Sequence, residues 1–342
     1  MEISWQEVTS DPLLSRCHAA CVTHEGRVYI HGGLASLKQS GQPLSSLVCW
    51  DPEANTVTEV ETGGEAVTRS HHTANISGDV MILTGGWDGK NRTSEVSAFN
   101  LKTRKWLNLR HLEELSRPPF GLSGHSCTMI RSSLFCVLGR EGGLKIQRRF
   151  GDIFLLHINI DTDNHVGTYY WKEAPVKTKS RSGHTALLAP SLRFGGDLYG
   201  LFVFGGRDDE SVHKCGQWKA EEVEVQSVQA VDNEELYRDI GTITRDLVPD
   251  KPVALRYHSM LSINKRCVIV IGGENFRSRN NISGRLQVCL FRERAAHWHS
   301  LDTGEGRAAA CAVSLASGVF IISGRNEKRV LSSICRLTIN KD

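Results

Sequence analysis

A short apolar strand that ends in a Gly-Gly doublet, or in a degenerate form of it, recurs six times in this chain of 342 residues. The six doublets are Gly32-Gly33, Gly85-Gly86, Gly139-Arg140, Gly205-Gly206, Gly272-Gly273 and Ser323-Gly324. The first positions of successive doublets are 53, 54, 66, 67 and 51 residues apart. A strand–glycine unit at this spacing predicts a repeat architecture, in which each unit packs against its sequence neighbours.

Two further features recur with the same period. A turn rich in arginine and histidine lies about fifteen residues before each doublet, and the sixth copy, at 307–310, has lost its histidine. The histidines of these turns are His18, His71 or His72, His125, His184 and His258. A third strand follows most doublets and often leads to a tryptophan, as at Trp106, Trp171 and Trp298. Because the histidines recur once per repeat, we expect them to hydrogen bond within the fold.

With these motifs the chain resembles the kelch-repeat family over nearly its whole length. The run GREGGLKIQRRFGDIF at 139–154 is the most specific part of the resemblance, and Arg140 and the sixth repeat depart from the usual pattern. The resemblance implies an all-β fold, a single six-bladed kelch β-propeller spanning 1–342, with four antiparallel strands in each blade. It also implies a protein-binding propeller without catalytic residues, and it suggests a cyclin as one partner.

The two chain ends predict how the ring closes. The sixth repeat ends with the strand SICRLTIN at 333–340 and lacks an outer strand with a tryptophan. Residues 2–8 form a short strand that carries Trp5 and belongs to no earlier repeat. We expect this N-terminal strand to complete the last blade, since closure removes an exposed sheet edge. A frayed N-terminus is the alternative.

The sequence favours neither a membrane protein nor a secreted one. It has no apolar run of eighteen residues and no basic-then-apolar leader, so we expect a cytoplasmic protein with reduced cysteines, or one of the nucleus or the ciliary axoneme. An iron triad of the Glu-x-x-x-Asp-x-x-x-His type fails because Ile243 stands where the histidine would be. Phosphate-loop and nucleophile-elbow motifs are absent as well. We therefore predict no enzyme activity, no catalytic residues, no cofactor and no metal.

The loops that follow the doublets are basic. Segments 34–46, 87–94, 140–151, 274–285 and 325–333 sum to +9, whereas the whole chain carries +3. The cations predicted to bind protein are Arg92, Arg140, Lys145, Arg148, Arg149, Arg277, Arg279, Arg285, Arg325 and Arg329. Because these loops share one end of a propeller, the sequence predicts a partner with an acidic surface or tail. A solvated rim without a partner is the alternative, and the few aromatic residues disfavour nucleic acid.

A long insert in the fourth repeat, about 207–255, is acidic and partly helical in its pattern. Residues 207–252 carry twelve acids and six bases. The apolar stripe Leu236, Ile240, Ile243 and Leu247 has helical spacing, and Asp232 with Glu235 resembles a capping box. The stripe is predicted to contact protein, either the propeller itself or a partner.

These features predict a non-catalytic interaction scaffold or adaptor, within a cyclin-containing complex or a large assembly such as an axoneme. The alternative is the substrate-recognition subunit of a ubiquitin ligase, because several kelch relatives recognise acidic segments with arginine-rich faces. We expect the ring to use both termini, which leaves no segment for a BTB, F-box or cullin-box module.

Overall fold

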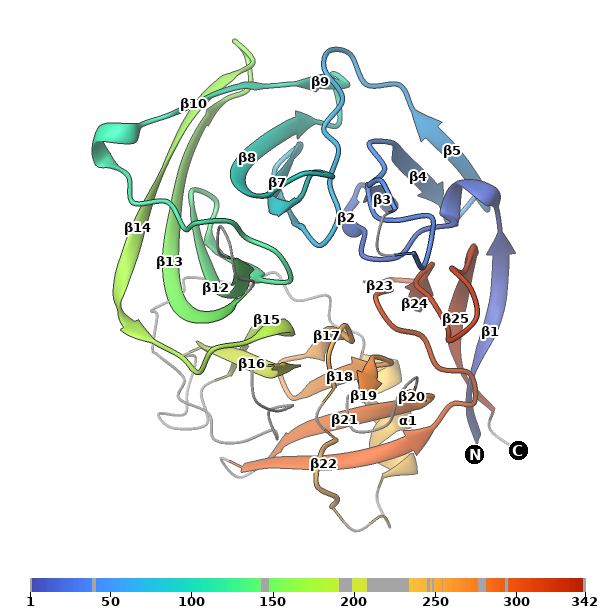
Figure 1. The fold of residues 1–342 in the computed structure, drawn as a ribbon. Helices are drawn as coiled ribbons and strands as arrows, with labels where there is room; N and C mark the ends of the chain where they lie inside the picture. Colours follow the sequence, from blue (N-terminus) through green and yellow to red (C-terminus); the bar gives the residue numbers. More distant parts are fainter. Residues whose placement is uncertain are drawn as a thin grey trace.

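The computed structural model describes residues 2–340 except for 39–40, 143–147, 191–198, 208–233, 245–246, 248, 254, 276–280 and 293–294. Its sheets are arranged around a central axis, and sequence order follows the ring (Figure 1). None of the helices in the described residues is long and apolar enough to cross a membrane.

The first three repeats form complete sheets. The first contains β2 (Ala20–His24), β3 (Arg27–His31), β4 (Leu47–Asp51) and β5 (Thr56–Val60). The second contains β6 (Thr73–Ser77), β7 (Val80–Trp87), β8 (Arg92–Asn100) and β9 (Lys105–Trp106). The third contains β11 (Ser126–Arg131), β12 (Leu134–Gly142), β13 (Arg148–Asp161) and β14 (Val166–Lys177), with β10 (Asn108–His111) added parallel to β14.

The remaining repeats complete the ring. The fourth contributes β15 (Ser182–Pro190) and β16 (Tyr199–Arg207). The fifth contains β17 (Ser259–Asn264), β18 (Cys267–Ile271), β21 (Arg285–Arg292) and β22 (Ala295–Asp302), beside the small pair β19 (Glu274–Asn275) and β20 (Asn281–Ile282). The sixth contains β23 (Cys311–Leu315), β24 (Gly318–Ile322), β25 (Ser333–Asn340) and β1 (Glu2–Ser10). Two 3-10 turns, η1 (Pro12–Leu14) and η2 (Glu113–Leu115), and one helix, α1 (Glu234–Ile243), are described besides the strands.

The all-β propeller is confirmed, but six full blades are not. Five sheets have four or five strands, whereas in the described residues the fourth repeat has only the two-stranded β15–β16 sheet. β16 is followed by the long insert, whereas a shorter loop leads to the next strand in the complete repeats. Residues 208–233 of that insert, with its predicted capping box at Asp232, lie outside the described residues.

Closure by the N-terminal strand is confirmed. β1 pairs antiparallel with β25 from Glu2 opposite Asn340 to Ser10 opposite Ser333, with one irregularity near Thr9. Ile3 is buried in a core shared by the fifth and sixth repeats, and the Trp5 indole donates to the Thr303 hydroxyl at 3.1 Å. The first and last segments of the chain are thus locked in one sheet.

A closed ring of backbone hydrogen bonds surrounds the axis. Each of six turn residues donates its N–H to the carbonyl of the equivalent residue in the preceding repeat, over 2.7–3.1 Å. The six residues are His18, His71, Gly124, Gly183, Tyr257 and Ala309, and all have φ between 53° and 69°. This ring corrects the predicted set of equivalent histidines, because His18 is equivalent to His71 and not to the histidines of the other repeats.

The true repeat histidines are His72, His125, His184 and His258, each one position after its ring residue. The Nε2 atoms of the last three hydrogen bond to hydroxyls of the preceding repeat, with His184 3.0 Å from Ser126 Oγ. They therefore tie neighbouring sheets together, as a structural role requires.

The doublets are needed because the next repeat approaches them closely. A Cβ on Gly272 would lie 2.0 Å from the Arg307 carbonyl oxygen, which accepts a hydrogen bond from Gly273 N–H at 2.7 Å. The carbonyls of Arg69 and Leu255 approach the first and fourth doublets in the same way. A side chain at the first glycine would push the two repeats apart.

We expect Gly272→Ala to destabilise the protein by about 2–4 kcal/mol, from left-handed strain plus the clash with Arg307. Gly26→Ala is the matched control, since Gly26 also has a positive φ but no atom lies within 4 Å of the position that its Cβ would occupy. It should cost about 1–2 kcal/mol. Urea denaturation of both variants measures the difference, and equal losses would contradict the close-approach explanation.

Candidate protein-binding face

The residue after each doublet lies beside the axial ring, because its backbone pairs with the turn of its own repeat. These six residues are Leu34, Trp87, Glu141, Arg207, Glu274 and Arg325. The position is therefore occupied by two apolar, two acidic and two basic side chains. It forms the inner rim of the face on which the predicted basic loops lie, which we call the doublet face.

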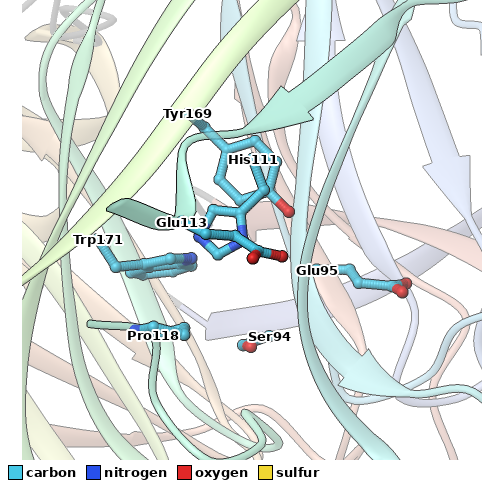
Figure 2. A pocket seen from close by; sticks show the side chains of 7 residues that line it. All are labelled: Ser94, Glu95, His111, Glu113, Pro118, Tyr169 and Trp171. Carbon is cyan, nitrogen blue, oxygen red and sulfur yellow. The ribbon is translucent and has the colours of Figure 1, made fainter. Parts of the chain in front are cut away.

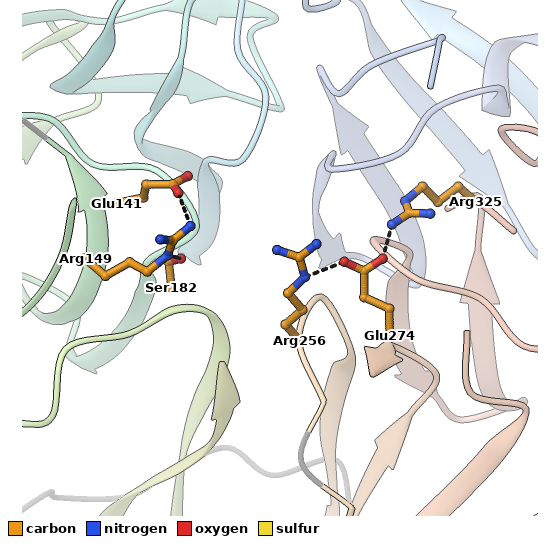
Figure 3. A network of polar contacts seen from close by, with 6 residues as sticks. All are labelled: Glu141, Arg149, Ser182, Arg256, Glu274 and Arg325. Atoms are coloured by element: carbon orange, nitrogen blue, oxygen red, sulfur yellow. Dashed lines mark hydrogen bonds and ion pairs between the residues drawn. The ribbon is translucent and has the colours of Figure 1, made fainter. Parts of the chain in front are cut away.

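Two carboxylates on this rim hold arginines in place (Figure 3). Glu141 accepts from Arg149 Nη2 at 2.7 Å, and its other oxygen lies 3.8 Å from Arg92 Nη2. Glu274 forms ion pairs with both Arg256 and Arg325. Both carboxylates are only 11% exposed. Each acid is thus shared by two arginines, which leaves an excess of positive charge.

An aromatic plug fills the axis next to these arginines. The rings of His18 and His71 stack at 3.8 Å, and Tyr257 meets them edge-on at 4.6 and 5.9 Å. Burial, with Arg92 and Arg256 nearby, lowers the pKa of His71 to about 4. Burial and the neighbouring His71 hold the pKa of His18 well below its usual range. The plug is therefore neutral near pH 7, and the positive charge beside it comes from arginine.

Nine of the ten predicted cations fall into three groups. Arg148, Arg285 and Arg329 are exposed, at the start of β13, at the start of β21 and in the turn before β25. Arg92, Arg149 and Arg325 belong to the carboxylate clusters of the rim. Lys145, Arg277 and Arg279 lie outside the described residues, so the predicted pocket shared by Arg148, Arg149, Arg277 and Arg279 stays a prediction.

Arg140 has a structural position instead. Its side chain is 7% exposed, and its Nη1 donates to the carbonyls of Phe120 and Gly121 at 3.0 and 3.3 Å. Its Nη2 lies 3.2 Å from Asp152, and its guanidinium stacks over Phe150. A partner could not reach this group without breaking those contacts, so we leave Arg140 out of the proposed contact set.

The apolar stripe of the insert packs on the propeller. Ile240 is fully buried, and Leu236 and Ile243 pack against the same core as Ile263 of β17. Leu247 does not join them, because it lies beyond the end of α1 and is 43% exposed. The structure therefore shows that Leu236, Ile240 and Ile243 contact the propeller, which is one of the two surfaces predicted for this stripe.

Two hollows lie between the second and third repeats. One, of about 420 Å³, is lined by Ser94 and Glu95 of β8, by His111, Glu113 and Pro118 of the connecting segment, and by Tyr169 and Trp171 of β14 (Figure 2). The other is a groove of about 720 Å³ that shares Ser94 and Pro118 with the first. The segment that follows β10, which pairs with β14 of the third sheet, contributes to the lining of both.

One group in the described residues has the composition of a metal site. The ligand atoms of His24, Glu25 and Asp79 lie within 4.8 Å of one another, and His24 Nε2 is 3.3 Å from an Asp79 oxygen. Glu25 is exposed and Asp79 is partly so. A partly exposed contact between His24 and Asp79 of the first two repeats accounts for this arrangement.

Sequence reasoning missed Glu141, Glu274 and Arg256 as parts of the site. A sum of charges over whole loops does not show which side chains meet. A signal was nevertheless present, because Glu141 and Glu274 occupy the same position after their doublets.

Comparisons with known proteins agree with the fold. Residues 1–191 match the family model described as the KLHDC2/KLHL20/DRC7 Kelch-repeats domain. The chain is 32% identical over 308 residues to Kelch domain-containing protein 9 of Mus musculus, which covers 89% of this chain and 85% of the mouse protein. For Kelch domain-containing protein 9 of Homo sapiens the identity is 31% over 299 residues, covering 86% and 82%. Host cell factor 2 of Homo sapiens is 29% identical over 134 residues, or 34% of this chain and 16% of that protein.

Proposed function

The chain belongs to the kelch-repeat family, and we propose that it is a non-catalytic protein-binding propeller whose doublet face receives an acidic segment of a partner protein. Kelch propellers are generally protein-interaction domains. The observation that supports an acidic partner is the pair of carboxylate clusters at the rim. Four arginines, Arg92, Arg149, Arg256 and Arg325, share the two acids Glu141 and Glu274.

These clusters favour binding for a physical reason. An arginine fixed by a buried carboxylate has already lost much of its side-chain freedom, so an incoming acid meets a preorganised donor. The pKa of Arg207 is lowered by burial and by the neighbouring Arg149 and Arg256, which indicates a locally positive potential. A negatively charged segment would relieve that repulsion.

The test uses exposed cations that hold no part of the fold. Arg148→Glu combined with Arg329→Glu should weaken binding of a fluorescein-labelled oligoglutamate peptide about tenfold, since each reversal removes attraction and adds repulsion. Arg149→Glu is unsuitable, because it would place a second carboxylate against Glu141. Fluorescence anisotropy at low salt measures the change.

Lys102→Glu combined with Lys265→Glu is the matched control. Both lysines are exposed at the strand ends opposite the doublets, so the same change in net charge falls on the other face. This control should bind as the unmodified protein does. If both double variants weaken peptide binding equally, net charge alone explains the effect. That result would contradict a site on the doublet face.

The cellular setting is a further part of the proposal. We place the protein in the cytoplasm, in a cyclin-containing complex of the cytoplasm or nucleus, or in a ciliary axoneme. Affinity purification from native tissue with and without intact cilia separates these settings. Recovery of the same partners from both preparations would exclude the axonemal one.

A further inference from the structure

We propose that the groove between the second and third repeats, bounded by β8, residues 117–121, β12, β13 and β14, is a docking site for an acidic peptide segment that carries one large apolar side chain. Phe120 supplies the apolar contact, and Lys90, Arg92 and Arg117 supply the positive charge. This inference rests on the proposed function for the acidic character of the partner, but it assigns binding to a groove that shares only Trp87 and Arg92 with the rim of the doublet face.

The groove has the size and the lining that a short segment of chain requires. Its volume is about 720 Å³. Trp87, Pro118, Pro119, Phe120 and Phe154 give it apolar walls, and charged side chains stand among them. Apolar walls with a few placed polar groups are typical of binding pockets in this size range.

Phe120 is the most exposed large apolar side chain in the part of the chain that the structure describes. It is 75% exposed, whereas Phe99, Phe135 and Phe154 of the adjoining strands are all buried. An exposed phenylalanine contributes little to the fold, and its burial by a partner would remove a large apolar area from water. Aromatic anchors of this kind dominate the energetics of protein interfaces.

The turn that carries Phe120 is held on both sides. Arg140 donates to the carbonyls of Phe120 and Gly121 from the third repeat. On the other side Leu122 N–H donates to Thr93 of β8 at 3.0 Å. Gly121 has a φ of +73°, and a Cβ there would lie 2.8 Å from the Arg92 carbonyl oxygen. The arginine at the second doublet position thus holds the backbone of the turn that presents Phe120, which lowers the entropy lost on binding.

The charges of the groove select an acidic occupant. Its lining contains the bases Lys90, Arg92, Arg117 and Arg140 and the acids Asp152 and Glu173, a balance of +2. Asp152 is committed to Arg140 and to Lys177, at 3.2 and 3.1 Å. Arg92 also lies 3.8 Å from Glu141 of the rim, so the two exposed bases Lys90 and Arg117 face one remaining acid, Glu173. The Arg92 guanidinium also lies over the Trp87 ring at 5.6 Å, which orients its donors.

The experiment selects ligands from a random peptide library displayed on phage, with the full chain immobilised. Enriched peptides should combine acidic residues with a phenylalanine, tryptophan or leucine. A labelled synthetic copy of the most enriched peptide is then titrated by fluorescence anisotropy. Phe120→Ser should weaken its binding about tenfold to a hundredfold, and Arg117→Glu about tenfold.

Leu115→Ser is the matched control for Phe120→Ser. Leu115 is 55% exposed in the same connecting segment, but it does not line the groove. Its replacement should leave binding unchanged. All three variants should melt at the temperature of the unmodified protein, because each replaced side chain is exposed.

Three results would overturn the proposal: no enriched peptide, enriched peptides without acids, or binding that Phe120→Ser does not weaken. A labelled single-stranded oligonucleotide that binds the unmodified protein and is lost in both groove variants would assign the groove to nucleic acid. The Arg148→Glu and Arg329→Glu variant separates the two proposals. If this double variant abolishes binding and Phe120→Ser does not, the doublet face is the binding site and the groove proposal is wrong. If Phe120→Ser abolishes binding and the double variant does not, the groove is the binding site and the doublet-face proposal is wrong.

Discussion

Deletion of residues 2–8 should leave the ring open and the protein largely unfolded at physiological temperature. The deletion removes most of the pairing between β1 and β25 and exposes the edge of β25. It also removes Ile3 from the core between the fifth and sixth repeats, and Trp5, which packs against that core. Loss of the tryptophan alone costs about 3–5 kcal/mol, and the isoleucine about 2–4 kcal/mol. Together these approach the whole stability of a typical domain, about 5–15 kcal/mol.

Two point variants on the same strand make this prediction specific. Ile3→Ala should lower the free energy of unfolding by about 2–4 kcal/mol, because Ile3 is 6% exposed. Gln6→Ala, at an exposed position of β1, should change it by less than about 0.5 kcal/mol. Thermal melts followed by circular dichroism measure all three proteins. A deletion variant that melts at the temperature of the full chain would show that β1 does not close the ring.

The repeat spacing was enough to predict the propeller, and the two chain ends were enough to predict its closure. Most doublets mark places where a glycine permits one backbone to approach another. Gly272 beside the Arg307 carbonyl is an example. The histidine register was harder to predict. In the second repeat His71 and His72 are adjacent, and only the positive φ of His71 and of its equivalents shows which one belongs to the axial ring.

The charges of the site were predictable in sign but not in arrangement. Arg325 meets Glu274 from a repeat 51 residues earlier, and such a contact depends on the curvature of the ring. Arg140 is a loop cation by sequence position, yet its side chain turns inward to hold the turn at Phe120. A charge count treats both arginines alike, whereas burial separates an arginine of the site from an arginine of the fold.

The buried histidines should make the protein unstable in mild acid. Burial is the largest cause of a lowered pKa in seven of them: His18, His31, His71, His72, His125, His184 and His258. The pKa values of His31, His125 and His258 are lowered to about 3, and that of His71 to about 4. In the unfolded chain each imidazole takes up its proton near pH 6.5.

The direction of the effect follows from these pKa values. The unfolded chain binds protons below about pH 6.5 and the folded chain does not, so stability is complete above that pH and is lost as the pH falls towards the folded pKa values near 4 and 3. Each histidine that stays neutral in the folded chain lowers the free energy of unfolding by about 1.4 kcal/mol for each pH unit of acidification in this window. Three such histidines together would lower the free energy of unfolding by about 4 kcal/mol per pH unit. Unfolding should therefore begin well above the pH near 4 at which ordinary carboxylates titrate.

Urea denaturation at several values between about pH 7.5 and 5.5 measures this slope. Below about pH 6.5, His184→Gln should reduce the slope by up to about 1.4 kcal/mol per pH unit, since it removes one titrating group. Ser126→Ala is the matched control, because it removes the 3.0 Å hydrogen bond to His184 and keeps the imidazole. It should lower stability at every pH and leave the slope nearly unchanged. A free energy of unfolding that stays constant across this range would mean that the buried histidines take up protons without unfolding the ring.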